Sequence, residues 1–421
     1  MKKVMLLLLF SLAFGQWIDT IIPLPDSFLP CEICCNYRNN KIYCYGLHDT
    51  LIILDCSTYR VITSFPIGSG LHYLCYNSRD NKVYCSTWEY GGMGGIIVIN
   101  GATDSLVFIP LGVGRRVISS LYYNPYNNKL YCALYNDSIV VIIDGTTDSI
   151  LRRIRVGAGP YAFCYNHRNN KVYCANSESG NISVIDGVTN LLINTIPAGR
   201  GAKALCYNSI NNKVYCANYE DTSITVINGT TDSVIKTIYL RPLYHRGGPD
   251  ILCYNSYNNK VYCGNYYDCL VTIINGATDS VITCFYVQYP IDCYYNSINN
   301  KIYFGGDWRG FTIINGATDS VITNLLLGTN VYYFDWDSVR NVTYAPVRYC
   351  EGYLSAIAVI RDSILPAIEE KPTSQIIRSS VLKTKENLFD ITGRKVNNLY
   401  LRRGVYFLKE KEYIQKVILI K

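Results

Sequence analysis

One short pattern recurs along most of this chain of 421 residues. The tetrad Asn-Lys-(Val/Ile/Leu)-Tyr occurs seven times, with 41 to 47 residues between successive lysines. The lysines are Lys41, Lys82, Lys129, Lys171, Lys213, Lys260 and Lys301. An eighth, degenerate copy ends at Tyr344 and has Val342 in place of the lysine. A period of about 40 to 50 residues is typical of an array of repeated supersecondary units.

The unit around Lys260 shows what one repeat contains. Two stretches rich in β-branched and aromatic residues, 251–254 and 261–263, flank an Asn-rich turn. A second pair, 269–274 and 281–287, flanks Asn-Gly-Ala-Thr-Asp-Ser. Asn and Gly readily adopt the backbone conformations that tight turns require, so each pair of stretches predicts a hairpin. Four short antiparallel strands, called A to D in chain order, predict one blade of a β-propeller. The tetrad tyrosine has the same place in every B strand, so it is expected to pack between blades rather than to stack on a carbohydrate.

The ends of the array predict how the ring closes. Residues 17–23 resemble a D strand such as 192–197, whereas the last unit ends at 354–360 without a D strand of its own. An N-terminal strand that completes the last blade removes an exposed sheet edge. The fold class is therefore all-β, with eight four-stranded blades between residues 16 and 365. Seven blades is the alternative if the degenerate last unit packs differently.

The repeat also resembles a known family. Val172-Tyr-Cys-Ala-Asn176, followed by Ile182-Ser-Val-Ile-Asp-Gly187, is similar to the YVTN repeat of secreted and surface-associated β-propellers, with Cys-Ala in place of Val-Thr. The resemblance implies the propeller fold. It does not specify a function, because related propellers include surface-layer proteins, nucleic-acid or ligand binders and lactonase-like enzymes.

The N-terminus predicts export. Lys2 and Lys3 precede an apolar run at 4–10, and small residues stand at Ala13 and Gly15, which is the pattern of a secretory signal peptide. The apolar run is too short for a permanent membrane anchor. We therefore expect residues 1–15 to be removed and the protein to be exported without a transmembrane anchor.

The composition changes after the last repeat. Residues 366–386 read as a linker, and three β-type segments follow in 387–421, although a module start near residue 366 is an alternative. Asp-x-x-Gly-Arg at 390–394, then Gly-Val-Tyr-Phe at 404–407 and a final apolar strand, resemble a type IX secretion C-terminal sorting domain. The resemblance implies type IX-like export machinery as a partner and a secreted or outer-surface location reached through the periplasm. An ordinary accessory β domain is the alternative.

The net charge of +7 does not indicate an acidic ligand. Residues 366–421 contain 12 Lys or Arg and 6 Asp or Glu, and two more lysines belong to the leader. The predicted ring is therefore close to neutral. Its repeated lysines are expected to be surface charges beside turns, and no nucleic acid is expected as a partner.

Cysteine is frequent, with 18 in the chain. Five repeats carry two cysteines ten residues apart: Cys34 and Cys44, Cys75 and Cys85, Cys164 and Cys174, Cys206 and Cys216, Cys253 and Cys263. In a symmetric hairpin these residues face each other, and cross-strand disulfides would stabilise each blade in an oxidising compartment. Buried free thiols that pack as small apolar side chains are the alternative. Regular recurrence fits packing better than a metal site, so neither a metal nor a cofactor is expected.

A ligand site is expected where the repeat varies. The A–B and C–D turns on one face of the ring are uniform, whereas the B–C and D–A loops on the other face differ in length and chemistry. The position ten residues before each lysine is equally diverse and is expected to ring the mouth of the central channel. From these positions we predict a binding face made of His72, Trp88, Tyr161, Lys203, Tyr219, Asp250, Trp308 and Tyr332.

Three functions fit this sequence. The first is a binding module for an envelope protein or glycan, which we favour. The second is a lactonase-like hydrolase with a metal at the channel mouth, whose candidate groups are His72, Glu178 and Asp250. The third is a structural surface-layer component. No catalytic residue is predicted, because the four histidines stand in different repeats and no His-Glu-x-x-His or Gly-x-Ser-x-Gly motif occurs.

Overall fold

A computed structural model describes residues 16–362 except 26, 48, 69–72, 91–92, 114–116, 241–246, 307–309, 326, 328, 332 and 350–354. It also describes residues 375–376, 388–389, 404–410 and 413–419. The predicted signal peptide lies outside the described residues. The regular structure of the described residues consists of β-strands. A search of the same residues found no helix able to cross a membrane.

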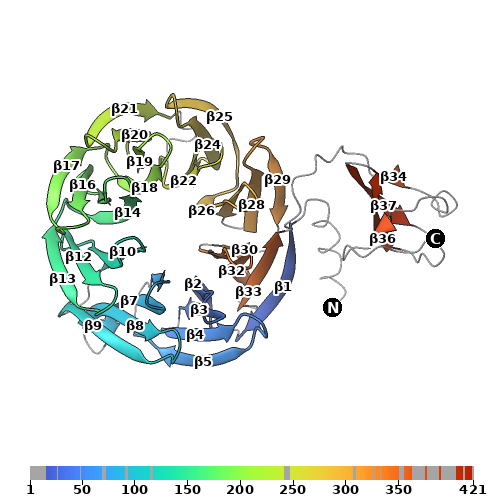
Figure 1. Cartoon of the computed structure of the whole chain (residues 1–421), viewed down its shortest axis with the longest axis horizontal. Coiled ribbons are helices and arrows are strands. Elements are labelled where there is room, and N and C mark those ends of the chain that lie inside the picture. The colour runs from blue at the N-terminus through green and yellow to red at the C-terminus, as the bar shows by residue number, and fades with distance from the viewer. Residues whose placement is uncertain are drawn as a thin grey trace. The chain divides into compact units, whose positions relative to one another are not determined.

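The chain up to Asp362 forms a ring of eight antiparallel blades in the described residues (Figure 1). This confirms the all-β propeller and excludes seven blades. Blade 1 consists of β2 (Pro30–Asn36), β3 (Lys41–Gly46), β4 (Thr50–Asp55) and β5 (Val61–Pro66). Blade 2 consists of β6 (Leu74–Asn77), β7 (Lys82–Tyr90), β8 (Met93–Asn100) and β9 (Leu106–Val113). Blade 3 consists of β10 (Ile118–Asn124), β11 (Lys129–Leu134), β12 (Ile139–Asp144) and β13 (Ile150–Arg155).

The next four blades repeat this arrangement, with the A strand innermost and the D strand at the rim (Figure 1). Blade 4 consists of β14 (Pro160–Asn166), β15 (Lys171–Asn176), β16 (Asn181–Asp186) and β17 (Leu192–Pro197). Blade 5 consists of β18 (Ala202–Asn208), β19 (Lys213–Asn218), β20 (Ser223–Asn228) and β21 (Ser233–Tyr239). Blade 6 consists of β22 (Ile251–Asn255), β23 (Lys260–Asn265), β24 (Leu270–Asn275) and β25 (Ser280–Tyr286). Blade 7 consists of β26 (Pro290–Asn296), β27 (Lys301–Gly306), β28 (Gly310–Asn315) and β29 (Val321–Leu325).

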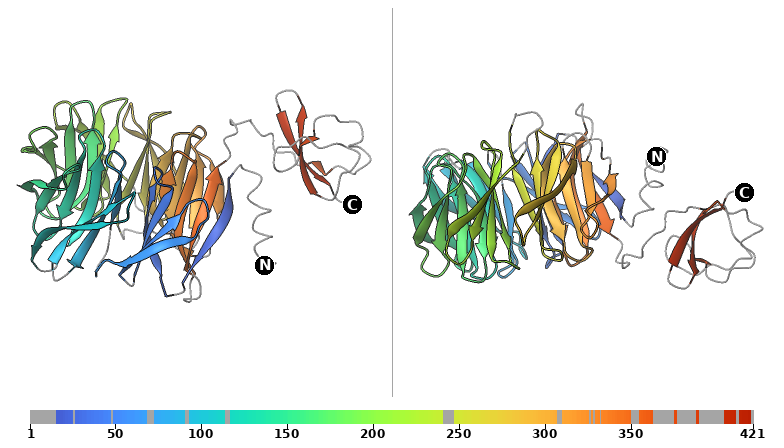
Figure 2. Two further views of the ribbon diagram at one scale, coloured as in Figure 1. Left: turned by 60° about the horizontal axis from the view of Figure 1, so that its bottom comes forward. Right: turned by 90° about the horizontal axis from the view of Figure 1, so that it is seen from above.

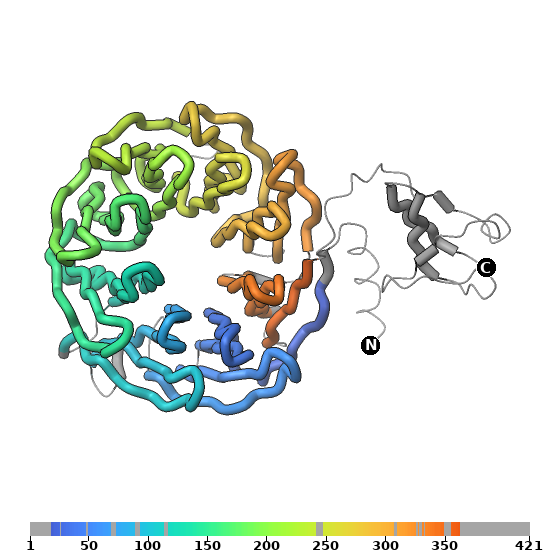
Figure 3. Tube along the Cα trace, in the orientation of Figure 1, coloured from blue at the N-terminus to red at the C-terminus, as the bar shows by residue number. Residues whose placement is uncertain are grey.

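Blade 8 closes the ring with strands from both ends of the array. Its inner strand is split into β30 (Thr329–Asn330) and β31 (Asp335–Asp337), which both pair with β32 (Val342–Tyr349). Strand β33 (Ser355–Asp362) follows, and the N-terminal strand β1 (Gln16–Leu24) pairs antiparallel with it as the outermost strand. In Figure 3 the blue start of the ring lies beside its orange-red end. The predicted closure is confirmed.

The hydrophobic core lies between the blades. The B and C strands are buried, as Ile42 to Tyr45 in β3 show, whereas D strands such as β17 are mostly exposed. Each core cluster joins residues of consecutive blades, which stand side by side around the ring (Figure 2). The tyrosine of every tetrad is at most 1% exposed, as is Tyr344 in blade 8. These tyrosines therefore pack between blades, as the repeat predicts.

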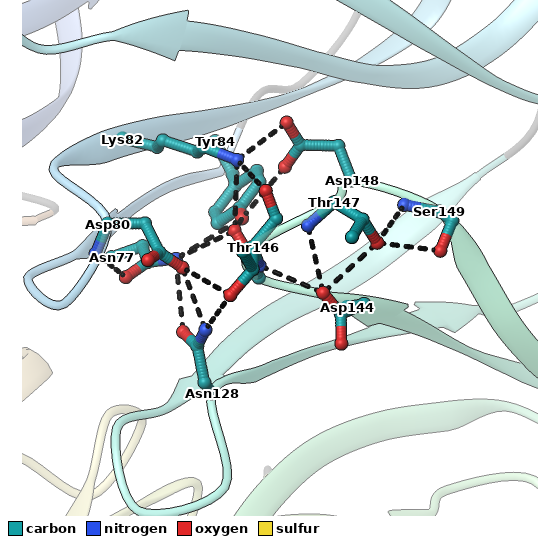
Figure 4. A network of polar contacts seen from close by, with 11 residues as sticks. Asn77, Asp80, Lys82, Tyr84, Asn128, Asp144, Thr146, Thr147, Asp148 and Ser149 are labelled. Atoms are coloured by element: carbon teal, nitrogen blue, oxygen red, sulfur yellow. Dashed lines mark hydrogen bonds and ion pairs between the residues drawn. The ribbon is translucent and has the colours of Figure 1, made fainter.

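The repeated lysines are not exposed turn charges, and this expectation was wrong. Each lysine reaches the C–D turn of the next blade, as Figure 4 shows for blades 2 and 3. There the Lys82 Nζ donates to Asp148 Oδ2 at 2.7 Å and to the carbonyl oxygens of Gly145 and Thr146. The Tyr84 hydroxyl donates to the other oxygen of Asp148 at 3.2 Å. We call this lysine, tyrosine and turn residue an inter-blade latch.

The latch recurs around the ring with one change of partner and one replacement. The ion pairs are Lys41–Asp104, Lys82–Asp148, Lys171–Asp232, Lys213–Asp279, Lys260–Asp319 and Lys301–Asp362. Lys129 instead donates to the neutral amide oxygen of Asn190 at 2.7 Å. At the junction of blades 8 and 1, Val342 takes the lysine position and Tyr59 the aspartate position, and Tyr59 packs against the cluster that contains Val342.

Asparagines form a second polar ring beside the latches. In blades 1, 2 and 4 to 7, the asparagine that ends the A strand donates its side-chain N–H to the asparagine at the end of the next A–B turn, as in Asn208 to Asn259 at 2.7 Å. Asn259 itself has a φ of 56°. Asn and Gly are the residues that accept this left-handed conformation most readily. The uniform A–B turns therefore serve both hairpin geometry and contacts between blades.

The cysteine pairs do not face each other within the hairpins, so the predicted in-blade disulfides are wrong. In blade 1, Cys34 pairs with Tyr43 and Ile33 pairs with Cys44, which places the two cysteines one position apart in register. A one-residue offset sends side chains to opposite faces of a sheet. The pairs in blades 2, 4, 5 and 6 have the same offset. Within the described residues, none of the ten cysteines named above forms a disulfide.

Residues 363–421 form a separate compact unit. Its described strands are β34 (Gln375–Ile376), β35 (Leu388–Phe389), β36 (Gly404–Glu410) and β37 (Tyr413–Leu419). Strand β36 pairs antiparallel with β35 and β37, and β34 adds parallel to β37. This small sheet contains the Gly-Val-Tyr-Phe segment and the final apolar strand singled out in the sequence, whereas Asp-x-x-Gly-Arg at 390–394 lies outside the described residues. Its assignment as a sorting module remains a prediction.

Candidate binding site at the inner strands

In blades 1, 3, 4, 5 and 7 the variable position ten residues before the lysine coincides with a β-bulge in the A strand, whereas Asp250 directly precedes β22. The pairing of β18 with β19 shifts between Ala202 and Ala204, so Lys203 is the extra residue. Tyr161 is the extra residue of β14 in the same way. A bulged residue is left out of the ladder and its side chain is re-aimed. Its side chain is therefore less constrained by the strand pairing, which explains why this position varies in so regular a repeat.

Lys203 lies against two tyrosine rings. Its Nζ is 4.4 Å from the ring centroid of Tyr219 and 5.9 Å from that of Tyr161. Tyr219 follows the B strand of the same blade, whereas Tyr161 comes from the bulge of blade 4. Both distances are within the range of cation–π attraction. The ammonium group is thus held between adjacent blades by aromatic faces.

Asp250 completes this group from blade 6. Its Oδ1 is buried and has no hydrogen-bond partner among the residues that the structure describes. Burial raises the pKa of Asp250 to about 7, although the Lys203 ammonium and the backbone N–H of Tyr266 oppose the shift. Burial and the Asp250 carboxylate also raise the pKa of Tyr161. We call Tyr161, Lys203, Tyr219 and Asp250 the Lys203 cluster.

Further tyrosines extend the cluster along the B–C loops. The ring of Tyr219 is 6.3 Å from that of Tyr267, which is 5.0 Å from that of Tyr266. Tyr267 is 44% exposed. Gly247 allows this packing, since a Cβ there would lie 2.6 Å from the Tyr219 hydroxyl oxygen. Burial and Tyr267 raise the pKa of Tyr219 to about 12, so its hydroxyl is protonated at neutral pH. The result is a partly exposed aromatic surface with one cation and one carboxyl group.

The structure brings together four of the eight predicted binding residues, those of the Lys203 cluster. Trp88 lies near the end of β7 in blade 2, and no described contact joins it to the cluster. His72, Trp308 and Tyr332 lie outside the described residues. Tyr289, whose ring is 5.3 Å from that of Tyr266, was not predicted. It stands in a D–A loop, and its sequence signal is an aromatic residue directly before the Pro290 that begins an A strand.

Sequence reasoning also missed an acidic group on the inner strands of blades 7, 8 and 1. Its members are Asp292, Asp335 and Glu32. Burial and the nearby Asp292 raise the pKa of Glu32 well above its usual range. Burial raises the pKa of Asp292 to about 7. Glu32 and Asp292 each stand nine residues before a tetrad lysine, a position that holds Ala or Ile in blades 4 to 6. This change from apolar to acidic residues was the sequence signal for the group.

Tyrosines connect the acidic group to the Lys203 cluster. Tyr73 of blade 2 and Tyr333 of blade 8 lie close enough for each to influence the pKa of the other. Burial, together with Tyr161 and Glu32, raises the pKa of Tyr73. Tyr161 therefore lies near enough to Tyr73 that ionising one hydroxyl would disfavour ionising the other. The inner ends of blades 7, 8 and 1 therefore carry the acidic group, and those of blades 4 to 6 carry the Lys203 cluster.

The residues considered for metal binding do not form a site in the described part of the chain. No three His, Cys, Asp or Glu side chains there gather closely enough to hold a metal ion. Of the groups considered for a hydrolase, Glu178 lies in an exposed B–C loop, Asp250 belongs to the Lys203 cluster and His72 lies outside the described residues.

Comparisons with known proteins identify the fold. No protein-family model matches the sequence, and no curated protein matches it. Among solved structures, the chain is similar to the computationally designed Ika8 protein, with a TM-score of 0.64 and 14% sequence identity. The match covers 82% of this chain and 99% of Ika8. At this identity the likeness concerns the eight-bladed fold alone.

Proposed function

We propose that the protein is a binding module whose ligand docks on the Lys203 cluster and the neighbouring tyrosines. The observation that carries this proposal is the Lys203 ammonium over the rings of Tyr161 and Tyr219, beside the unpartnered carboxyl oxygen of Asp250. A buried polar atom without a hydrogen-bond partner lowers the stability of a fold, and most buried polar atoms in proteins are paired. A ligand donor at Asp250 and flat ligand faces on the tyrosines would use these groups.

The chemistry of the cluster favours a polymer that offers both polar groups and flat faces, such as an envelope glycan or a protein segment. Tyrosines present apolar faces with polar tips and suit surfaces that are wet in the free protein. The opposite face of the ring is occupied by latches and turn hydrogen bonds. Binding on the loop face therefore leaves the contacts between blades untouched.

Removing the aromatic part of the cluster is expected to abolish most of the binding. Cell-envelope preparations are separated into a protein and a polysaccharide fraction, and each is titrated with the purified ring. The variant Tyr219→Ala is expected to weaken binding by at least about tenfold, as for an aromatic hot spot. Tyr257→Ala is the matched control, because Tyr257 is 75% exposed on an A–B turn of the opposite face. Equal loss in both variants, or no loss in Tyr219→Ala, would contradict the proposed site.

We also propose that the chain reaches the cell exterior with residues 1–15 as its leader and residues 387–421 as a type IX-like sorting module. The basic surplus of the tail and its separate compact unit support this division. Deleting residues 387–421 is expected to leave the ring folded and the protein in the periplasm. Fractionation with immunoblotting measures the location, and the melting curve of the purified ring measures folding. Continued appearance of the truncated protein at the surface would disprove the sorting role.

A further inference from the structure

At every described junction between consecutive blades from 1 to 8, one residue of an A strand packs with one residue of the next A strand. The first stands two residues before the end of its A strand, and the second stands three residues before the end of its own. The same core clusters hold these pairs: Cys34 with Leu74, Cys75 with Leu121, Tyr122 with Phe163, Cys164 with Leu205, Cys206 with Leu252, Cys253 with Cys293 and Tyr294 with Phe334.

The junction of blades 6 and 7 differs from the other described junctions because both positions are cysteine. Cys253 comes from β22 and Cys293 from β26, which are neighbouring inner strands (Figure 1). Both side chains pack in the cluster that contains Tyr262, Ile302 and Phe304. Where one residue is Cys at the other junctions, its partner is leucine. The two positions that hold a thiol and a leucine side chain at those junctions hold two thiols at the junction of blades 6 and 7.

The two thiols lie close enough to interact. Both side chains pack in one core cluster, and the neighbouring Cys253 thiol, together with burial, raises the pKa of the Cys293 thiol well above its usual range. Cys293 is partly exposed, whereas Cys253 is 6% exposed. The pair is reduced in this structure, and Cys293 is the member open to a small reagent.

We infer that Cys253 and Cys293 form a redox-modification site at which a disulfide oxidant links blades 6 and 7 covalently. The thiolate of one cysteine attacks a sulfur of the oxidant, such as oxidised glutathione, and releases one glutathione thiolate. The thiolate of the other cysteine then displaces the second glutathione and forms the Cys253–Cys293 bond. Both cysteines lose their protons to the solvent, and the two electrons reduce the oxidant. This site is independent of the proposed ligand face.

The test is a map of disulfides formed in the folded full-length chain. The reduced protein is incubated with oxidised glutathione at about pH 8.5, where more thiol is ionised. Remaining thiols are then alkylated in denaturant, and peptides are mapped without reduction. We expect one prominent cross-link between the peptides of Cys253 and Cys293. Finding both residues alkylated, held as glutathione adducts or linked to other cysteines would overturn the inference.

The chain offers two matched variants. Cys293→Ala replaces the partly exposed thiol and is expected to abolish the cross-link while Cys206 stays alkylated. Leu252→Cys converts the junction of blades 5 and 6 to the same pair and is expected to add a second cross-link, from Cys206 to residue 252. If Leu252→Cys forms its link and the parent pair does not, the geometry permits bridging but the Cys253–Cys293 assignment is wrong. Oxidation in denaturant, where the cross-links are expected to scramble, shows whether the folded ring directs the pairing.

Discussion

The variant Lys213→Met is expected to lower the free energy of unfolding by about 3 to 5 kcal/mol, the usual cost of removing one partner from a buried ion pair. Lys213 Nζ lies 2.7 Å from Asp279 Oδ2, and the two side chains are only 13% and 7% exposed. Without the lysine, the Asp279 carboxylate keeps the Tyr215 hydroxyl as a donor at 2.6 Å but loses its compensating charge. Urea unfolding of the ring measures the change.

A control for this variant is built into the repeat. Lys129 occupies the same latch position, but its partner is the neutral Asn190. Lys129→Met therefore removes a hydrogen bond without leaving a buried carboxylate unpaired, and we expect it to cost no more than about 1 to 2 kcal/mol. Equal destabilisation by the two variants would show that the lysine stem, and not its charge, stabilises the latch.

The closing junction supplies the design for a rescue. Val342 and Tyr59 replace the lysine and the aspartate there, and Tyr59 has a φ of 57°, close to the 56° of Asp279. We therefore expect the double variant Lys213→Val with Asp279→Tyr to recover part of the stability that either single variant loses. Apolar replacement of both members of a buried ion pair is often close to neutral. A double variant that loses the sum of the two single effects would contradict this equivalence.

The sequence predicted the eight blades, the closure and the buried tyrosines, because each depends on a pattern that repeats with the chain. It did not predict the latches. A lysine and the aspartate it contacts belong to different blades, so their pairing is visible only once the ring places consecutive blades side by side. The joint change to Val342 and Tyr59 at the junction of blades 8 and 1 was the one available clue.

The prediction of disulfides within the hairpins failed because of the local register of the strands. Asn36 pairs with Lys41 at the end of the first hairpin, so residues whose numbers sum to 77 face each other, whereas Cys34 and Cys44 sum to 78. Spacing alone does not establish this register, and one residue of offset changes the face. The Lys203 cluster was predictable because the bulged positions of Lys203 and Tyr161, the B–C loop at Tyr219 and the residue before β22 all tolerate variety. The acidic group was not, because burial and proximity of carboxyl groups depend on how the blades meet.

Those acidic groups predict an unusual dependence of stability on pH. Burial raises the pKa of Asp292 to about 7, and burial with nearby carboxylates raises that of Glu32. In the unfolded chain such groups titrate near pH 4. Between about pH 4 and 7 the folded ring therefore holds more protons than the unfolded chain, and these groups make its free energy of unfolding fall as the pH rises. The contribution of Asp292 is fully favourable below about pH 4 and is lost as the pH rises through about 7.

Asp292→Asn is expected to remove its share of this dependence. Asp292 accepts a hydrogen bond from the backbone N–H of Cys293 at 2.8 Å, and the amide oxygen of Asn can accept the same bond. The free energy of unfolding of the variant, relative to the parent, is expected to rise between pH 4 and pH 8 by on the order of 3 to 4 kcal/mol, the equivalent of about three pKa units. Denaturant titrations across this range measure the difference. Asp292 lies outside the Lys203 cluster, so ligand binding is expected to be retained.

Asp144→Asn is the control of opposite sign. The backbone N–H and the hydroxyl of Thr147 hold the pKa of Asp144 below its usual range. That carboxylate stabilises the ring above its unfolded pKa, and the stabilisation is lost as the pH falls through its folded pKa. Its variant is therefore expected to lose stability relative to the parent at neutral pH and to approach it in acid. A difference between Asp292→Asn and the parent that stays constant from pH 4 to pH 8 would show that Asp292 is ionised in the folded ring over this whole range.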